Sequence, residues 1–344
     1  MKFNNVCIEA LGYHLPEQVV SSDDIEKRLS PIYDALKLPY GRLQLMSGIR
    51  ERRFFDKSET PSSVASIAGE QALSRTTLDR KRIGCLIHAS VCRDFLEPAT
   101  AAVVHNNLKL DPGAMVFDIS NACLGVLNGM VTVANMIELG QIEAGLIVSG
   151  ENGGPLVDAT IENLLSRKDI CRADVKSAFA SLTIASAAVA VLLTHRDIST
   201  TGHRLLGGAA MAETRFNDLC RGEGDSGVGP LMETDSEAML KEGCQLAGRT
   251  WEQTRSELGW SNDDVDRVFC HQVGSAHRRL LYETLQLDPA KDFSTLEFLG
   301  NTGSASLPST LAIGEERGLL EKGNRAALLG IGSGLNCLML GVEW

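Results

Sequence analysis

The stretch FDISNACLGVLNGM, from Phe117 to Met130, places a cysteine where an expected strand gives way to an expected helix. On its amino-terminal side, AMVFDIS is apolar enough to be a buried strand. On its carboxyl-terminal side, small and apolar residues recur at helical spacing, with no charged residue before Glu138. Cys123 is therefore either a small core residue, as most cysteines are, or a nucleophile held at the start of a buried helix.

The rest of the chain alternates between short apolar runs and helical patterns, which is typical of α/β proteins. The expected strands are residues 82–91, 114–120, 143–151, 187–195, 266–273 and 325–334, and the expected helices include residues 60–75 and 235–259. Two pairs of stretches resemble each other and occur in the same order: 78–91 with 263–276, and 142–151 with 323–334. These echoes predict a duplicated chain, with an amino-terminal half of residues 1–197 and a carboxyl-terminal half of residues 198–344.

Composition excludes several classes of protein. The net charge of −11 argues against a general nucleic-acid or anionic-membrane surface. No apolar run is long enough to predict a membrane span, and the amino terminus does not resemble a signal peptide. The nine cysteines are scattered without C-x-x-C spacing, which indicates reduced thiols in a cytoplasmic protein and no metal site. The glycine-rich and aspartate-rich residues 219–236 are expected to form a surface loop.

Three later stretches contain residues that could complete a site around Cys123. VFCHQVGSAHRRL ends a strand at His271, FLGNTGSASLPSTL puts Asn301 in a glycine turn, and LLGIGSGLN contains Gly334. A lone histidine or asparagine is most often a structural group, but strand ends are where α/β sheets present ligand groups. These side chains could converge on one acyl group, with the backbone N–H groups of Cys123 and Gly334 as an oxyanion hole. The helix amino terminus is expected to lower the pKa of Cys123.

Together these motifs resemble the thiolase-superfamily condensing enzymes of the 3-oxoacyl-acyl carrier protein synthase III group. GYHLPEQVVSSDDIEKRL and SGIRERRF resemble the amino-terminal segments of that group, and NACLGVLNG resembles its nucleophile motif. HQVGSAH and GNTGSASLP resemble its histidine and asparagine motifs, and GIGSGLN takes the place of its terminal glycine loop. The resemblance implies a thiolase fold, a five-layer αβαβα sandwich of two similar halves, in a homodimer that needs no metal or redox cofactor.

The same resemblance implies roles for the candidate residues. Cys123 would accept an acyl group as a thioester, and the Cys123 and Gly334 N–H groups would form the oxyanion hole. His271 and Asn301 would hydrogen-bond the carbonyl of the second substrate and stabilise its enolate. The substrates would be thioesters of CoA or of acyl carrier protein.

The stretch SVCRDFLEPAT departs from the ordinary pattern of that group. The residue before the proline is commonly an apolar aromatic that reaches across the dimer interface into the neighbouring site, and here it is Glu97. RDFLEP instead resembles the enzymes that join two long acyl-CoAs head to head in long-chain olefin biosynthesis, in which the equivalent glutamate is the proposed base. A carboxylate buried near an acyl site would have a raised pKa, as a base for α-proton removal needs. The implied product is a 2-alkyl-3-oxoacyl chain.

The expected CoA contacts also depart from the pattern. Many synthase III enzymes have a tryptophan and an arginine shortly before the segment that resembles SGIRER, and this chain has Arg42 and Met46 there and no tryptophan. Arg42 and Arg50 are therefore the expected contacts at the CoA mouth.

Three other interpretations remain open at the level of sequence. The first is a decarboxylative 3-oxoacyl-acyl carrier protein synthase III that uses malonyl-acyl carrier protein, in which Glu97 would be structural. The second is a cysteine hydrolase, because the order Cys, His, Asn also occurs there, although the C-G-[SA]-C-[WY] signature is missing. The third is a catalytically silent or redox-sensing thiol protein.

Overall fold

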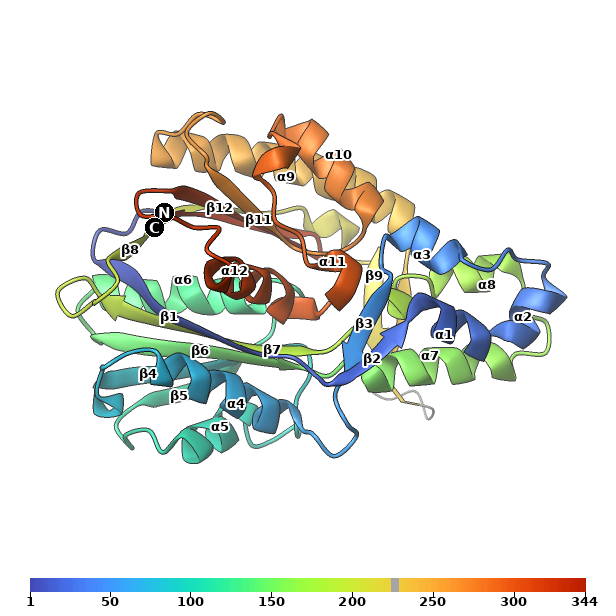
Figure 1. Cartoon of the computed structure of the whole chain (residues 1–344), viewed down its shortest axis with the longest axis horizontal. Helices are drawn as coiled ribbons and strands as arrows, with labels where there is room; N and C mark the ends of the chain where they lie inside the picture. Colours follow the sequence, from blue (N-terminus) through green and yellow to red (C-terminus); the bar gives the residue numbers. More distant parts are fainter. Residues whose placement is uncertain (224–228) are drawn as a thin grey trace.

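The computed structural model describes residues 1–223 and 229–344. Its main feature is a mixed sheet of nine strands in the order β11-β12-β13-β8-β1-β7-β6-β4-β5. These strands are β1 (Val6–His14), β4 (Ile83–Ala89), β5 (Met115–Ile119), β6 (Ala144–Glu151), β7 (Ala187–His195), β8 (His203–Ala212), β11 (Arg267–Cys270), β12 (Arg325–Gly332) and β13 (Asn336–Glu343). The junction of β1 with β8 is short, with Cys7 opposite Arg204 and Ile8 opposite His203. On either side of it the strands form two layers (Figure 1).

Helices fill the space between these layers and cover their outer faces (Figure 1). The central helices are α6 (Gly125–Glu138) and α12 (Ser306–Glu316), and the outer helices are α4 (Pro61–Ser74), α5 (Thr100–Leu108), α9 (Ser236–Leu258) and α10 (Ser275–Leu285). One apolar cluster joins α6 and α12 to both sheet layers, and two further clusters lie under the outer helices. The order helix, sheet, helix, sheet, helix confirms the thiolase fold expected from the sequence.

Small residues allow the central helices to lie close to the strands. A Cβ atom added to Gly129 of α6 would be 2.7 Å from the Ile147 side chain of β6, so only glycine permits this approach. All residues of β6 and nearly all of β7 are buried, which is why both read as continuous apolar runs in the sequence.

The strand order repeats across the β1–β8 junction. Read toward the junction, β11-β12-β13-β8 corresponds to β4-β6-β7-β1, and β5 is an additional strand outside β4. The stretches that echo each other in the sequence contain β4 and β11 in one case and β6 and β12 in the other, and each half pairs its two strands in parallel. The duplication is thus confirmed, whereas the boundary between residues 197 and 198 stays a prediction.

A group of short elements extends from one end of the sandwich, at the right of Figure 1. It contains α1 (Ser22–Arg28), α2 (Ser30–Ala35), α3 (Arg42–Ser47), α7 (Gly154–Ser166), α8 (Arg172–Ser177) and the hairpin of β2 (Gln18–Ser21) with β3 (Glu51–Phe54). These elements have an apolar cluster of their own, so they form a cap with a separate small core. The short helix α11 (Leu296–Leu299) lies at the border between this cap and the sandwich.

The structure corrects the expectation of a simple loop at residues 219–236. Strands β9 (Cys220–Glu223) and β10 (Leu231–Thr234) pair antiparallel within that segment. Residues 224–228, between the two strands, lie outside the described residues.

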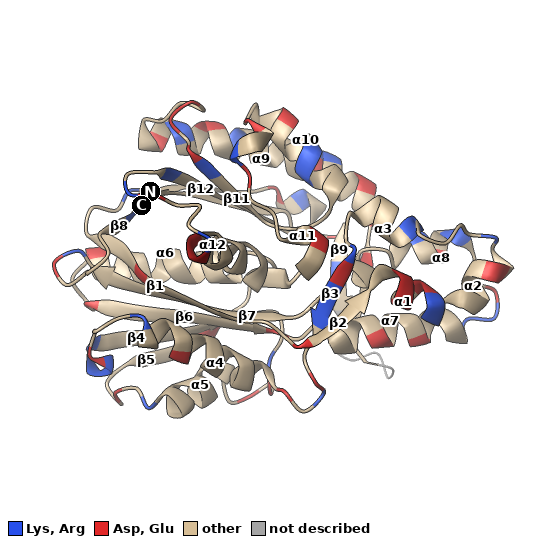
Figure 2. Ribbon diagram, in the orientation of Figure 1, with Lys and Arg blue, Asp and Glu red and all other residues tan. Residues whose placement is uncertain are grey.

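Charged side chains follow the layered arrangement. Figure 2 colours charged residues along α9, α10 and the cap, while the central strands carry few and, of the outer helices, α4 contains one and α5 none. Within residues 1–223 and 229–344, no helix is both long enough and apolar enough to cross a bilayer.

Candidate active site

Cys123 lies in a strained turn between β5 and α6. Ala122 has a φ of 45°, in the left-handed region that residues with a Cβ rarely adopt. The turn is closed by the Leu124 N–H, which donates to the Asn121 carbonyl at 2.9 Å. Strain of this kind persists only where the surrounding structure holds it, and it is common at functional sites.

The expected lowering of the Cys123 pKa was wrong. Burial of the thiol, and then the negative charge of Glu151 and the proximity of Cys220, raise the pKa of Cys123 to about 12. Helix α6 begins only at Gly125, so the Cys123 thiol lies before the first turn of the helix. The effect of the helix dipole is strongest within that first turn, so it does little for the Cys123 thiol. Cys123 is therefore a protonated thiol in the free protein and would have to lose its proton to act as a nucleophile.

The terminal glycine loop lies against the Cys123 backbone. A Cβ atom on Gly332 would be 3.6 Å from the Cys123 nitrogen and 3.8 Å from its Cβ. The Asn336 amide donates to Asn121 Oδ1 at 3.4 Å and ties the loop to the nucleophile turn. Gly334 lies two residues beyond Gly332, with a φ of 110°. Its role as an oxyanion donor stays a prediction.

His271 follows β11 directly and is 3% exposed. Its backbone N–H donates to the Leu329 carbonyl of β12 at 3.0 Å, which fixes its place at the sheet edge. Burial, together with the nearby His277, lowers the pKa of His271 to about 3, so the ring is neutral. Its buried Nδ1 has no hydrogen-bond partner among the described residues. Buried polar atoms are rarely left unpaired, so this nitrogen is a candidate for contact with a substrate.

Asn301 is anchored by its backbone and oriented by its side chain. Its N–H donates to Thr183 at 3.1 Å, and its carbonyl accepts from Ala185 at 2.8 Å. Its Oδ1 accepts from the Gly303 N–H at 3.1 Å, which identifies the amide oxygen because a backbone N–H can only donate. The Nδ2 group is then the part of the side chain that remains available to donate.

The segments that carry the three predicted catalytic residues contact one another. A Cβ atom on Gly125, two residues after the nucleophile, would be 3.4 Å from Ser304, three residues after the asparagine. The N–H of Gln272, next to the histidine, donates to Ser306 at the start of α12 at 3.3 Å. The structure thus brings the three segments to one end of the central layer.

Glu97 lies outside this group within the chain. It is exposed, in the loop of residues 90–99 that connects β4 with α5. Among the described residues, no hydrogen bond or ion pair joins it to the three predicted catalytic residues. Its neighbours Phe95 and Leu96 are also exposed, at 55% and 93%, so the loop presents an apolar tip around a carboxylate.

The two expected CoA contacts lie on the segment that borders the histidine and asparagine loops. Arg42 begins α3 and is partly exposed. The Arg50 side chain is paired with Glu297 at 3.0 Å, and its backbone N–H donates to the Glu297 carbonyl at 2.9 Å. A Cβ atom on Gly48 would be 2.8 Å from Ser275, four residues after His271. Their contact with CoA stays a prediction.

The sequence analysis missed one residue that is central to this geometry. Glu151 ends β6 and is buried beside the nucleophile turn. The sequence held a signal for it, since SGE closes an apolar run at the carboxyl end of a strand, where α/β sheets present polar groups. The contact of Gly332 with Cys123, in contrast, depends on packing that no motif specifies.

Comparison with known proteins identifies the family. The family model described as 3-oxoacyl-[acyl-carrier-protein] synthase III matches residues 117–212, and the model of its C-terminal part matches residues 256–344. An acyl-CoA:acyl-CoA alkyltransferase of Shewanella oneidensis is 41% identical, with 100% of both chains covered. The chain belongs to the 3-oxoacyl-acyl carrier protein synthase III family.

Two further matches also span nearly the whole chain. An acyl-CoA:acyl-CoA alkyltransferase of Xanthomonas campestris is 37% identical, again with 100% of both chains covered. The crystal structure of a cysteine-to-serine variant of Xanthomonas campestris OleA, with bound lauric acid and lauroyl-CoA, has a TM-score of 0.94 at 36% identity, and the match covers 99% of this chain and 100% of that one. The family resemblance predicted from the sequence is confirmed.

Proposed function

We propose that this protein is an acyltransferase that joins two acyl-CoA molecules by Claisen condensation through a thioester on Cys123. The observation that carries the proposal is full-length similarity, at 41% identity, to an acyl-CoA:acyl-CoA alkyltransferase. The grouping of the Cys123, His271 and Asn301 segments at one end of the central layer supports it.

The first half-reaction loads the enzyme. The Cys123 sulfur attacks the carbonyl of the first acyl-CoA, and the bond between that carbonyl and the CoA sulfur breaks as the new thioester forms. The thiol proton of Cys123 leaves with the CoA, so the exchange is balanced. The N–H groups of Cys123 and Gly334 would stabilise the tetrahedral oxyanion.

The second half-reaction forms the carbon–carbon bond. A base removes an α-proton from the second acyl-CoA, and the resulting enolate accepts hydrogen bonds from neutral His271 and from the Asn301 amide. The α-carbon then attacks the acyl-Cys123 carbonyl, the Cys123 thiolate leaves, and it takes up the proton that the base removed. The product is a 2-alkyl-3-oxoacyl-CoA, which is released as the thioester or, after hydrolysis, as the acid.

We assign the base to Glu97 of a second copy of the chain in a homodimer. An ordinary acyl-CoA has no carboxylate to lose as carbon dioxide, so its carbanion requires a base. The exposed apolar residues Phe95 and Leu96 beside Glu97 support insertion of this loop into another subunit. The exposed edge strand β5, with Met115 at 47% exposure, provides a surface next to the nucleophile turn on which the second copy could pack.

The remaining assignments follow from the same chemistry. Arg42 and Arg50 would contact CoA at the mouth of the site, and acyl carrier protein could deliver one of the two thioesters. The reaction transfers acyl groups and protons alone, so it calls for no metal or redox cofactor. We place the enzyme in the cytoplasm.

The test is incubation of the purified protein with a single acyl-CoA, followed by mass spectrometry of the products. Condensed product and free CoA are expected without any malonyl donor, and Cys123→Ala should abolish both. A strict requirement for malonyl-acyl carrier protein would instead establish the decarboxylative alternative. Release of fatty acid without a condensed product would establish a thioester hydrolase.

A further inference from the structure

Glu151 is a buried carboxylate to which the reaction above assigns no role. It ends β6 and is 4% exposed. Its Oε1 accepts from the N–H of Val91 at 3.0 Å, and from the N–H and hydroxyl of Ser304 at 3.1 and 2.9 Å. Its Oε2 accepts from the N–H of Cys92 at 3.3 Å. No lysine or arginine in the described part of the chain forms an ion pair with it.

One of the two segments that Glu151 holds carries Asn301. Ser304 lies in the short turn after Asn301, and the Gly303 N–H in that turn donates to the Asn301 amide oxygen. Gly303 has a φ of 58°, and a Cβ atom there would be 3.0 Å from the Glu151 carboxyl carbon. The turn therefore packs directly against the Glu151 carboxylate. The position of this turn sets the direction of the Asn301 amide.

The other segment begins the loop that carries Glu97. Val91 and Cys92 are the second and third residues of the loop 90–99, and both of their N–H groups point to Glu151. One carboxylate thus bridges a loop of the first half of the chain and a turn of the second half, over more than 200 residues of sequence.

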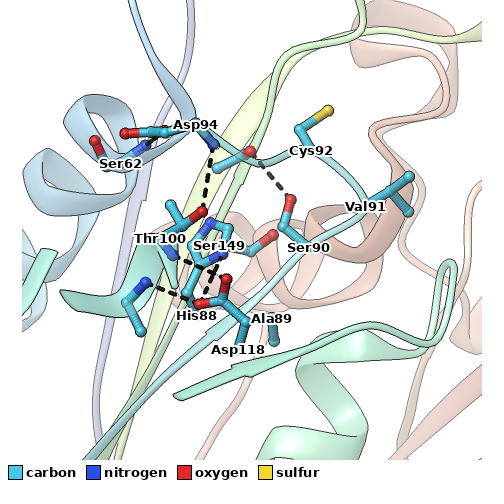
Figure 3. A network of polar contacts seen from close by, with 12 residues as sticks. Ser62, His88, Ala89, Ser90, Val91, Cys92, Asp94, Thr100, Asp118 and Ser149 are labelled. Atoms are coloured by element: carbon cyan, nitrogen blue, oxygen red, sulfur yellow. Dashed lines mark hydrogen bonds and ion pairs between the residues drawn. The ribbon is translucent and has the colours of Figure 1, made fainter. Parts of the chain in front are cut away.

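The far end of the loop 90–99 is held by a separate polar network (Figure 3). The Asp94 N–H donates to the Thr100 hydroxyl at 3.3 Å, and Asp94 Oδ1 accepts from the Ser62 N–H at 2.9 Å. Asp118 accepts from the Thr100 N–H at 2.9 Å at the start of α5. Since both ends of the loop are fixed, its exposed tip is presented in one place, and loss of the Glu151 contacts would release one end.

We propose that Glu151 is a positioning residue that aligns the Asn301 amide of its own site and the loop that presents Glu97. The proposal rests on the proposed function, because those two groups act on the second substrate. It assigns Glu151 to the condensation step, whereas on the acylation of Cys123 the expected effect of Glu151 is limited to its charge, which raises the pKa of the thiol.

Two variants test this assignment. Glu151→Gln keeps the shape, but its amide NH₂ would face the Cys92 N–H donor and could not accept from it. Glu151→Asp keeps the charge and lacks one methylene, so its carboxylate cannot reach both segments. If Glu151→Gln does not fold, Glu151→Asp still tests the proposal. For both, we expect kcat for condensation to fall roughly 100-fold, as misplacement of catalytic groups by about 1 Å does. Acylation of Cys123, followed by intact mass, should stay near the wild-type rate in Glu151→Asp, which keeps the charge. It should not slow in Glu151→Gln, because that variant lacks a charge that raises the pKa of Cys123.

Glu9→Gln is the matched control. Glu9 is also 4% exposed and also accepts from several donors, among them Thr76, Ser199 and Thr200. Its neighbour Ile8 lies opposite Leu193 of β7, whereas Glu151 lies opposite Ala187, so the two carboxylates are roughly 20 Å apart along the strand. Glu9→Gln should lower the unfolding temperature without changing kcat or the KM for acyl-CoA.

The outcomes separate the two levels of proposal. Wild-type kcat in both Glu151 variants would overturn the inference, as would a loss of activity that only matches the unfolded fraction, or equal losses in acylation and condensation. Failure of the wild-type enzyme to condense acyl-CoA would overturn the proposed function instead.

Discussion

Replacement of Asn301 by alanine should separate the two half-reactions. The change removes one amide that is expected to donate to the enolate of the second substrate. The backbone contacts of Asn301 with Thr183 and Ala185 do not involve the side chain and should persist. Only the acceptor for the Gly303 N–H is lost from the fold.

These contacts set the expected magnitudes. Loss of one donor to a developing oxyanion costs about 2.7–4 kcal/mol, so kcat for condensation should fall about 10²–10³-fold. Loss of the single hydrogen bond from Gly303 should lower the free energy of unfolding by only about 1 kcal/mol. Acylation of Cys123 does not involve Asn301 in this scheme and should change little.

The assay follows both steps in the same samples. Intact mass spectrometry after rapid mixing with acyl-CoA gives the rate at which acyl-Cys123 appears, and product analysis gives the rate of condensation. Asn301→Ala should accumulate acyl-Cys123. If acylation slows as much as condensation does while the protein remains folded, the assignment of Asn301 to the second half-reaction is wrong.

Three further predictions concern the second subunit, the thiol and acid stability. When Cys123→Ala and Glu97→Ala subunits are mixed in equal amounts, about half of the dimers contain one of each. If Glu97 acts across a symmetric dimer, each such dimer has one complete site, so about one quarter of wild-type activity should return. If Glu97 acts within its own subunit, no activity should return. Because the pKa of Cys123 is about 12, the rate of its alkylation by iodoacetamide should rise about tenfold per pH unit from about pH 7 to pH 10. The exposed Cys171 is an internal reference, and a plateau in the Cys123 rate below about pH 9 would contradict the prediction. Burial lowers the pKa of His271 from 6.5 to about 3. As the pH drops below about 6.5, this histidine is therefore protonated in the unfolded chain before it is protonated in the folded protein, so the free energy of unfolding should fall. Urea titrations should show a weaker loss for His271→Gln, and an identical loss in both proteins would contradict the prediction.

The fold could largely be predicted from the sequence because several of its strands, such as β7, are long apolar runs. Residues 187–195 were predicted as a strand and form β7 with those bounds. The sequence did not predict strands β1, β8 and β13, and the composition of β1 and β8 explains why those two were missed. Strand β1 carries the buried Glu9, and β8 contains Gly207 and Gly208, so neither reads as a plain apolar run. A buried carboxylate or a pair of glycines is tolerated there only because of contacts made in the folded state.

The candidate site could be predicted in its residue types but not in its electrostatics. The motifs placed Cys123 and His271 at strand ends and Asn301 in a glycine turn, and the structure brings those segments together. The direction of the Cys123 pKa could not be deduced, because it depends on burial and on a carboxylate 28 positions away in the sequence. The role of Glu97 was inferred from the chemistry of the second substrate, and the single chain leaves that residue exposed.

The central layer shared by both halves of the sandwich has a consequence for synthesis of the protein. Its apolar cluster takes members from β6 and β7 early in the chain and from β12 and β13 at the very end. While the chain emerges from the ribosome, α6 can cover only part of the inner face of β6 and β7, and the rest stays uncovered until α12, β12 and β13 have been made. Such exposed apolar surface is prone to aggregation, so the nascent chain should depend on chaperones until those elements have emerged. Heterologous expression should therefore improve when chaperones that bind nascent chains are co-expressed.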